Sequence, residues 1–449
     1  MTKDEQIQDL TAKLAVALAR ITELESLVLR LSTPKTSANS SLPPSTDLAR
    51  KNQSLREKSG RPVGGQKGHK GYGLSINPIP DVVKDLYSNF CNVCGESLAK
   101  SSFILESSRQ VIDIPPIIPI TTEYRCHSTT CSCGHQQTAS YPQGVERTIQ
   151  YGENIQALAI YQHSFQYLPF ARLQDFFQNV CNVSLAKGTI ENIIRRTAQK
   201  AMPIYQQLRN AVVVSFFVGS DETGFKLGGK KGWFWVWQTA VITYIVAACS
   251  RSKSVITDTF PEGLPNSVLC SDRLAAQLST ITQGTQICLA HLLRDLTYLI
   301  AAEKTTWATD FKVLLKDAIA LKQAQDQYLK DDSKAVQIQK RLDKLLDDKF
   351  LEELLLNQAK FKQTITFFRG MCKLKEAIFP FLYDKRIAFD NNASERAIRM
   401  VKLKTKVSGQ FKSLHQEFAI IRSVIGTAIK NNQSVFHAIK AMVNMPMPT

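Results

Sequence analysis

The sequence of 449 residues lacks an apolar run of about 18 residues or more, which excludes a membrane-spanning helix of ordinary length. Its longest apolar stretches begin at Ala211 and Thr239 and have the length of strands. The first residues include Asp4, Glu5 and Asp9 and lack the basic segment followed by an apolar one that a secretory signal needs. We therefore expect a cytoplasmic protein without a membrane partner.

Proline and glycine are also scarce, with 17 and 21 residues, and this excludes a collagen-like or low-complexity disordered chain. At roughly 150 residues per domain, the length predicts about three packed domains. Acidic residues are few relative to basic ones, because 56 Lys and Arg stand against 39 Asp and Glu, a formal net charge of +17. An excess of this size favours a polyanionic partner, and nucleic acid is the first candidate.

Apolar side chains recur every seven residues in residues 1–32. One repeating position holds Ile7, Leu14, Ile21 and Val28, and the other holds Leu10, Ala17, Leu24 and Leu31. β-Branched residues at the first position with leucine at the second favour a parallel two-stranded coiled coil. We predict a coiled-coil helix that makes the protein a homodimer or higher oligomer. The alternative is an amphipathic helix that lies on its own chain.

Residues 33–80 have the composition of a basic, flexible linker. Between Pro34 and Pro80 there are eight Lys or Arg residues and only two acids, Asp47 and Glu57. Such an arm binds phosphates without reading the base sequence, whereas the alternative is a plain solvated tether.

Five of the ten cysteines lie in one short stretch, in which CNVCG is followed by CSCG. Two close thiol pairs supply the four sulfurs of a closed tetrahedral zinc site, and the glycine after each pair permits a tight turn. The predicted Zn²⁺ ligands are Cys91, Cys94, Cys131 and Cys133. We predict a small zinc-binding domain over residues 81–145 with a structural role. Cys126 or His127 are alternative ligands, and free thiols are the alternative to a metal.

Residues 146–205 carry a helical pattern interrupted at Leu168-Pro169 and at CNVSLAKG. This order predicts a helix-turn-helix, whose last helix enters the major groove of DNA. The candidate DNA contacts on that helix are Lys187, Thr189, Arg195 and Arg196. The alternative is a helical bundle that does not touch DNA.

The pattern changes period between Ala211 and Asp272, where segments rich in valine, isoleucine and aromatic residues predict a sheet. Between Asn266 and Phe379 there is no proline, which predicts helices. We expect an α/β domain over residues 206–430 with a helical insertion at about 290–380, and a C-terminal tail over residues 431–449.

Three acids stand at unusual positions in this domain. Asp221 and Asp272 follow apolar strand segments, and Glu395 opens a helix after a DNN turn. Acids are depleted in buried strands, so three carboxylates at such positions can converge on two divalent cations that flank a phosphodiester. Each acid also has an ordinary interpretation as a turn or helix-capping residue.

Basic residues follow Glu395 without an intervening acid up to His415. Arg399, Lys402 and Lys406 fall close to the helix face of Glu395, so a metal ligand would be followed by phosphate contacts. A solvated surface helix would usually include acids.

Three segments resemble the signature blocks of the insertion sequence 66 family of bacterial DDE transposases. They read SDETGFKLGGKKGWFWVWQT, ICLAHLLRDLTYL and DNNASERAIRMVKLKTKVSGQFKS. NSSLPPSTD with GRPVGGQKGHKG, the paired cysteines around RQVIDIP, and YLPFARLQDFF with SLAKGTIENI are similar to the family's linker, zinc-binding and helix-turn-helix regions.

The resemblance implies a multidomain α+β protein with an RNase H-like catalytic core, in which Asp221, Asp272 and Glu395 are the catalytic metal ligands. It also implies that His291 and Arg294 support the site. The expected function is a transposase that binds the ends of a mobile element in the bacterial nucleoid and cleaves and joins DNA strands. Mg²⁺ or Mn²⁺ is the expected catalytic cofactor, and accessory transposition proteins are further candidate partners.

Two other functions remain open. One is a zinc-containing, dimeric DNA-binding regulator whose carboxylates are structural. The other is a different RNase H-like nuclease, which would not need three DNA-binding modules ahead of its core.

Overall fold

The computed structural model describes residues 2–36, 39–40, 64–71, 73–324 and 333–448. Most of the predicted basic linker therefore lies outside the described residues. The chain divides into two units, Met1–Ala49 with Thr121–Thr449, and Arg50–Ile120, and each is considered by itself. Among the described helices, none is both long enough and apolar enough to cross a bilayer.

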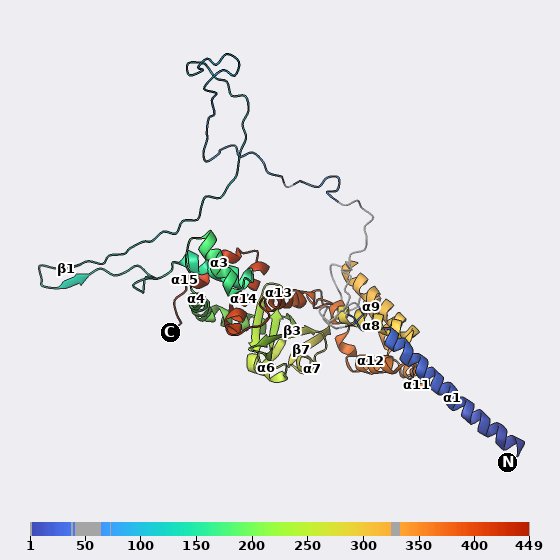
Figure 1. Ribbon diagram of the computed structural model, residues 1–449. Coiled ribbons are helices and arrows are strands. Elements are labelled where there is room, and N and C mark those ends of the chain that lie inside the picture. Colours follow the sequence, from blue (N-terminus) through green and yellow to red (C-terminus); the bar gives the residue numbers. More distant parts are fainter. Residues whose placement is uncertain (1, 37–38, 41–63, 72, 325–332, 449) are drawn as a thin grey trace. The chain divides into compact units, whose positions relative to one another are not determined.

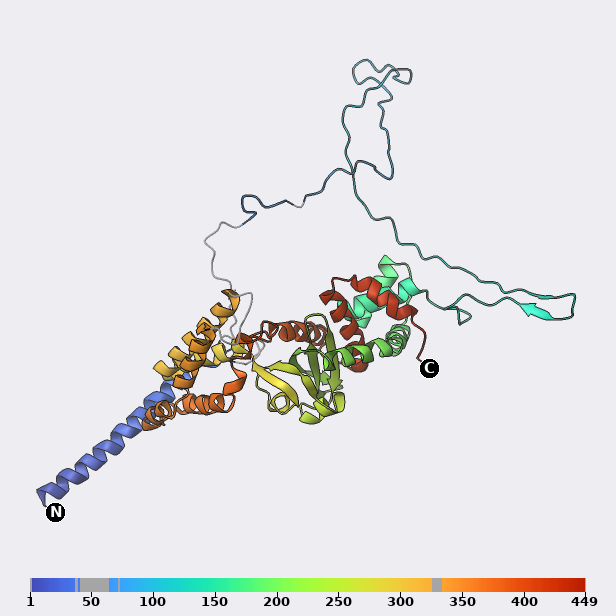
Figure 2. The same cartoon turned by 180° about the vertical axis from the view of Figure 1, so that it is seen from behind.

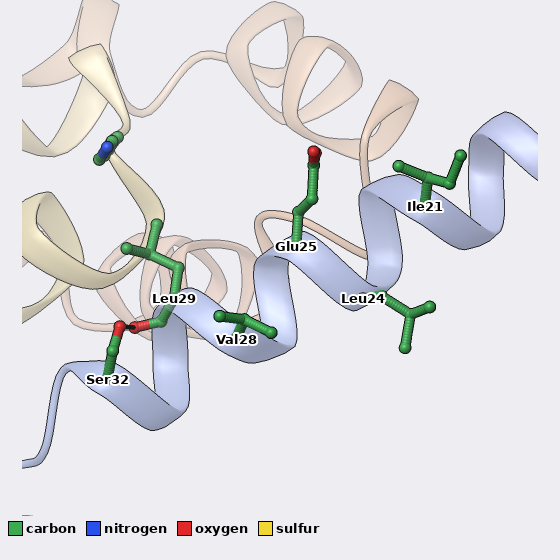
Figure 3. A pocket seen from close by; sticks show the side chains of 7 residues that line it. Ile21, Leu24, Glu25, Val28, Leu29 and Ser32 are labelled. Atoms are coloured by element: carbon green, nitrogen blue, oxygen red, sulfur yellow. Dashed lines mark hydrogen bonds between the residues drawn. The ribbon is translucent and has the colours of Figure 1, made fainter.

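Helix α1, Lys3–Ser32, begins with a capping box. The Thr2 N–H donates to Glu5 Oε2 at 2.7 Å, and the Glu5 N–H donates to Thr2 Oγ1 at 3.3 Å. The C-terminal part of the helix contacts its own chain, because Ser26 Oγ donates to the Ala359 carbonyl at 3.3 Å. Figure 3 shows this part of α1 and the open hollow that it lines.

Residues 81–150 contain no buried side chain. Their regular structure consists of β1, Ser128–Thr130, and β2, Gln136–Thr138, which pair antiparallel. The predicted zinc-binding region therefore has no apolar core of its own within these residues.

A helical bundle joins residues from both ends of the larger unit. Its elements are α2 (Glu153–Ile160), η2 (Tyr161–Phe165), α3 (Phe170–Val180), α4 (Lys187–Lys200), α14 (His415–Lys430) and α15 (Val435–Asn444). Their shared core includes Phe177 and Ile194 from the first part and Ile421, Ile425 and Met442 from the last. The bundle that contains the expected helix-turn-helix is therefore completed by C-terminal helices, which lie beside α3 and α4 in Figures 1 and 2.

The central sheet has five strands in the order β5-β4-β3-β6-β7. They are β3 (Phe217–Leu227), β4 (Lys230–Gln238), β5 (Thr243–Ala248), β6 (Leu264–Ser271) and β7 (Thr282–Ile287). Strands β3, β4 and β5 are antiparallel neighbours, whereas β6 runs parallel to both β3 and β7. The structure is thus mixed α+β, with a helical N-terminus and a central sheet.

Helices cover both faces of the sheet. On one face, Phe225 and Phe234 pack against Val401 of α13 (Asn392–Ser408) and Phe418 of α14. On the other, Trp235 and Trp237 share a core with α5 (Met202–Val213) and α6 (Lys253–Thr259). The alternation of side chains along β3 therefore decides which helices each residue faces.

Helices also fill most of the described chain between β7 and α13. They are α8 (Leu289–Glu303), α9 (Thr306–Ala324), α10 (Ser333–Leu345), α11 (Asp348–Leu356) and α12 (Lys362–Lys373), with short 3₁₀ turns η3 (Lys375–Ala377) and η4 (Pro380–Leu382). One apolar core, which includes Leu296, Phe311 and Phe368, holds them together.

The structure differs from the sequence-based expectation at two places. The segment at Ala211 does not begin a strand, because α5 extends to Val213 and buries Val212, and β3 starts only at Phe217. Residues 431–449, expected as a tail, contain α15, whose N-cap Ser434 accepts a hydrogen bond from the His437 N–H. Its buried Ile439, Met442 and Val443 explain why this amphipathic segment is a docked helix.

Candidate active site

The register of β3 and β6 brings Asp221 and Asp272 level with each other. The last parallel pair is Gly219 with Cys270, and each acid lies two residues further along its own strand direction. Asp272 directly follows β6, as expected. Asp221 lies inside β3 instead of at its end, because β3 continues as an antiparallel partner of β4 to Leu227. The two acids thus lie level with each other where β3 leaves its parallel neighbour.

Asp221 and Glu222 belong to opposite faces of the sheet. Glu222 accepts hydrogen bonds from Arg251 Nε at 2.9 Å and from Gln277 Nε2 at 3.1 Å. Asp221 lies on the same face of β3 as Gly219 and Phe225, because alternate residues of a strand share a face. Gly219 and Phe225 are covered by α13 and α14. Because neighbouring side chains of a strand lie on opposite faces, Glu222 is not placed to bind the same ion as Asp221.

Helix α13 begins directly on top of β3. A Cβ atom added to Gly219 would lie 2.6 Å from Ser394 Oγ and 2.8 Å from Asn391 Oδ1, so no other residue fits there without a shift. Asn391 Nδ2 also donates to the Ser220 carbonyl at 2.6 Å. These contacts fix the first turn of α13, which carries Glu395, against the strand that carries Asp221.

The electrostatics of Asp221 reflect its burial and the acids around it. Burial raises the pKa of Asp221 well above its usual range, and the charges of Asp272, Glu222 and Glu395 raise it further. A hydrogen bond from the Glu222 N–H to Asp221 Oδ1 at 2.9 Å opposes this shift. The uncharged form of Asp221 is therefore favoured until a cation compensates the repulsion.

Glu395 is surrounded by basic groups. Its Oε1 lies 3.8 Å from His291 Nε2 and 3.7 Å from Arg294, and its Oε2 lies 3.4 Å from Arg399. Burial and the charge of Arg294 lower the pKa of His291, which keeps its imidazole neutral near pH 7. His291 and Arg294 are thus placed to orient Glu395.

Several buried polar atoms near the acids have no hydrogen-bond partner among the described residues. They include Glu395 Oε1, His291 Nδ1, Asn391 Oδ1, Ser394 Oγ and Ser271 Oγ. Buried polar atoms are rarely left unpaired, and a site of oxygen donors with excess negative charge fits divalent cations. The residues present are therefore suited to hold the metal ions that were expected.

Cys288, three residues before His291, also lies in this region. It is fully buried, and its Sγ accepts a hydrogen bond from the Asn391 N–H at 3.2 Å. Ligand atoms of Cys288, His291 and Glu395 lie within 4.8 Å of one another. In the sequence, the only sign of this group is a cysteine three residues before a histidine at the start of a helix. The third member, Glu395, is brought to them by the packing of α13 near α8.

The basic residues of α13 divide between two directions. Arg399 and Lys406 are exposed, and Lys402 is partly buried. Burial lowers the pKa of Lys402, and the negative charge of Asp221 opposes this shift only in part. Lys404 points inward and donates from Nζ to the carbonyls of His163 at 3.3 Å and Leu168 at 3.2 Å. Lys404 is therefore a link between α13 and the bundle.

The predicted DNA contacts on α4 are only partly available. Lys187 and Arg195 are exposed, but Lys187 Nζ lies 3.7 Å from Glu191 and Arg195 Nε lies 3.5 Å from Glu417 of α14. Thr189 and Arg196 are half-buried. DNA phosphates would have to compete with these ion pairs.

Each thiol pair forms a local turn with a glycine in the left-handed region. The Gly95 N–H donates to the Cys91 carbonyl at 2.9 Å with φ of 73° at Gly95. The Gly134 N–H donates to the Cys131 carbonyl at 2.8 Å with φ of 85° at Gly134. In both pairs, backbone N–H groups of the second half of the turn lower the pKa of the first cysteine, which favours the thiolate.

Comparison with known families accounts for most of the chain. A model described as Transposase IS66 family matches residues 148–417, more than half of the sequence. The chain therefore belongs to the Transposase IS66 family, so it is a transposase, a class of enzyme that acts on DNA and uses divalent metal ions. A second model, described as a family of unknown function (DUF6444), matches residues 2–75. No curated protein matches the chain.

Proposed function

We propose that this transposase cleaves and joins DNA strands at a two-metal site formed by Asp221, Asp272 and Glu395. The observation that carries the proposal is geometric: the register of β3 and β6 sets Asp221 and Asp272 level, and the start of α13, which carries Glu395, packs on Gly219 of β3. Three acids from a strand, a strand end and a helix start are close enough to repel one another. Such repulsion is unfavourable unless cations balance it, so the cluster is a binding site for divalent ions.

The sheet supports an RNase H-like core. Three antiparallel strands are followed by two parallel strands on the side of β3, with the first acid on the central strand and the second after its parallel neighbour. The proposed catalytic domain extends over residues 206–430, with the helical insertion at about 290–380.

Asp221, Asp272 and Glu395 would hold Mg²⁺ or Mn²⁺. When bound, two such ions activate the attacking water or 3′-hydroxyl and stabilise the leaving oxygen. His291 and Arg294 orient Glu395, and the exposed guanidinium of Arg399 and the amines of Lys402 and Lys406 hold the DNA backbone beside the acids. No nucleophilic side chain is needed in this scheme.

The remaining modules would bring the element ends to this site. Lys187, Thr189, Arg195 and Arg196 of α4 are the proposed contacts to DNA, in a domain over residues 146–205. The coiled-coil helix over residues 1–32 is proposed to pair two copies, which suits a reaction that joins two element ends. Cys91, Cys94, Cys131 and Cys133 are proposed to take one structural zinc ion, a proposal that rests on their spacing and on the local turn of each pair.

The decisive experiment incubates the purified protein with labelled element-end DNA and Mg²⁺. Asp221→Asn, Asp272→Asn and Glu395→Gln should each lower strand cleavage roughly a thousandfold, because each removes a charge that the cations require. End binding, measured by mobility shift, should remain within about twofold of the wild type because a protein–DNA affinity depends mainly on phosphate contacts.

Asp258→Asn provides the matched control, since this carboxylate is exposed on α6 and faces away from the three acids. It should cleave like the wild type. A wild-type protein that binds element ends but cleaves nothing with Mg²⁺ or Mn²⁺ would instead be a DNA-binding regulator. An acid variant with normal cleavage would remove that acid from the site.

The zinc proposal has its own measurement. After extensive dialysis the protein should retain about one Zn²⁺ per chain, because closed thiolate sites bind tightly. Cys94→Ser should release the ion and increase proteolysis around residues 90–141, with Cys372→Ser, an exposed thiol outside the pairs, as control. Folded wild-type protein without zinc would contradict the proposal.

A further inference from the structure

A group of sulfur, nitrogen and oxygen donors lies next to the proposed magnesium ligands. Cys288 immediately precedes α8, His291 lies in its first turn, and Glu395 lies in the first turn of α13. One donor atom of each residue lies within 4.8 Å of the other two. Ligand atoms around one tetrahedral ion are separated by somewhat less than this, so small side-chain rotations suffice to bring all three onto an ion.

The surroundings of Cys288 are those of a sulfur that can become a thiolate. Its Sγ accepts a hydrogen bond from the Asn391 N–H, and the backbone N–H groups of His291 and Ala290 at the start of α8 also act to lower its pKa. Without a cation, burial outweighs these groups and raises the pKa of Cys288 to about 11. A bound cation would supply the charge that burial disfavours.

The other two donors have unused capacity. Glu395 Oε1 and His291 Nδ1 are buried without a hydrogen-bond partner among the described residues. His291 Nε2 faces Glu395 Oε1 at 3.8 Å, a separation that two ligands of one ion can adopt. The region therefore has a thiol, an imidazole and a carboxylate whose donor atoms lie within 4.8 Å of one another.

The donor set determines which cation it prefers. Magnesium is bound by oxygen ligands, whereas thiolate and imidazole select zinc and cations of similar softness. We propose that Cys288, His291 and Glu395 bind one Zn²⁺ ion and that this ion withdraws Glu395 from the magnesium site, so that zinc inhibits the transposase. The inhibitory part of this proposal rests on the proposed function of Glu395.

The binding step is balanced without an oxidant or reductant. The Cys288 thiol loses its proton to solvent and forms the Zn–S bond, His291 binds through the lone pair of its neutral imidazole, and Glu395 binds as the carboxylate. One proton is released, so binding should tighten as pH rises.

Metal binding can be measured without catalysis. Purified full-length wild type, Cys288→Ala and Cys270→Ala are titrated with Co²⁺, whose charge-transfer absorption reports thiolate ligands. Cys270 is the matched control, because it is an equally buried thiol on β6 outside the donor group. Wild type and Cys270→Ala should each bind one more Co²⁺ per chain than Cys288→Ala, while Cys91, Cys94, Cys131 and Cys133 contribute equally in all three.

Equal Co²⁺ stoichiometry in the three proteins would overturn the site. His291→Asn provides a second test that leaves the thiol in place, with circular dichroism to verify folding. It should lose the same Co²⁺ as Cys288→Ala, and retention of that ion would exclude His291 as a ligand and overturn the three-donor site.

Inhibition is measured as the ratio of cleavage with and without Zn²⁺ at fixed Mg²⁺, so that each variant serves as its own reference. The Zn²⁺ concentration for half-inhibition should be at least ~10-fold higher for Cys288→Ala than for wild type. Equal sensitivity would overturn the inhibitory role. If the wild type cleaves no DNA at all, the proposed function fails, but the Co²⁺ titration still decides whether the site exists.

Discussion

Helices α1 and α13 are both amphipathic, but only α13 has its apolar side covered by the chain itself. Val401 and Ile398 of α13 are buried against the sheet and α14. In α1 the seven-residue repeat stays exposed, with Leu14 60% and Val28 65% accessible. An amphipathic pattern thus leads to a buried helix face in α13 and to an exposed one in α1. The difference depends on whether the rest of the chain supplies an apolar surface for that face.

The contacts that α1 does make use residues outside its repeat. Ser26 and Arg30 bond to the Ala359 carbonyl, whereas Ile21, Leu24 and Val28 of the repeat line an open hollow (Figure 3). The attachment of α1 to its own chain and the exposure of its apolar seam are therefore compatible. The proposed pairing of two copies would bury this apolar seam, which is defined by the two repeating positions.

The largest effect is expected from charging the seam. Leu10→Glu with Leu14→Glu should weaken self-association roughly a thousandfold or more, because each leucine contributes ~1.5–3 kcal/mol when buried in both copies. Ala12→Glu with Val16→Glu has the same spacing and charge off the seam and should associate normally. Sedimentation equilibrium provides the measurement, and identical masses for wild type and both variants would mean that the seam does not pair.

The inward lysine of α13 should give the next largest effect. Burial lowers the pKa of Lys404 to about 8, below the 10.5 of the unfolded chain. Between these values the unfolded state holds the extra proton, so the free energy of unfolding rises with pH. Below pH 8 the full penalty for burying the charge is present, and it disappears as pH approaches 10.5.

The free energy of unfolding of wild type relative to Lys404→Met should therefore rise by roughly 3 kcal/mol between pH 7 and 10.5. Urea denaturation of both proteins across this range measures the difference in their free energies of unfolding. The other titrating groups are the same in both proteins, so their contributions cancel. A difference that is independent of pH would show that Lys404 titrates normally in the folded protein.

The seat of α13 on the sheet comes third. Gly219→Ala places a Cβ within 3 Å of Ser394, Asn391 and Gln238, so the first turn of α13 must move away from β3. A displacement of about 1 Å can lower cleavage ~100-fold. Gly224→Ala on the same strand meets nothing nearer than 3.7 Å and should leave cleavage unchanged. Comparable cleavage by the two variants would argue against the proposed role of this contact.

The smallest effect concerns the outward cations. Arg399→Ala should weaken DNA binding about tenfold and reduce the slope of log affinity against log salt by ~1, because one phosphate contact is lost. Lys253→Ala, an exposed lysine on α6, removes the same charge elsewhere and should leave the slope as it is. Titrations at several salt concentrations separate the two. Identical slopes would remove Arg399 from the DNA interface.

The sequence predicted the elements better than their junctions. The helix over the first 32 residues, the strand-length segments and the acid at the start of a helix follow from local periodicity and capping. The family assignment is confirmed by the matching family model. The roles of Asp221, Asp272 and Glu395 stay predictions, supported by the register of β3 and β6 and by the packing of α13 on Gly219.

Other features could not be read locally. Asp221 was expected at a strand end, but whether a strand continues depends on its partners, and β4 extends β3 by a hairpin. Lys404 belongs to a run of basic residues, and only the position of the bundle shows that it is buried. Cys288 gains meaning from Asn391, about a hundred residues later in the chain.

The helical segment between β7 and α13 begins and ends at the same place. The Leu289 N–H donates to the Phe389 carbonyl at 2.9 Å. Next to this bond, the Asn391 N–H donates to Cys288 Sγ at 3.2 Å. The segment is thus an insertion whose two ends are adjacent. The entropic cost of closing such a loop grows only with the logarithm of its length. Helices that follow α8 in this segment can therefore be shortened or lengthened without changing the distance from Asp272 to Glu395, whereas α8 must stay because it carries His291 and Arg294.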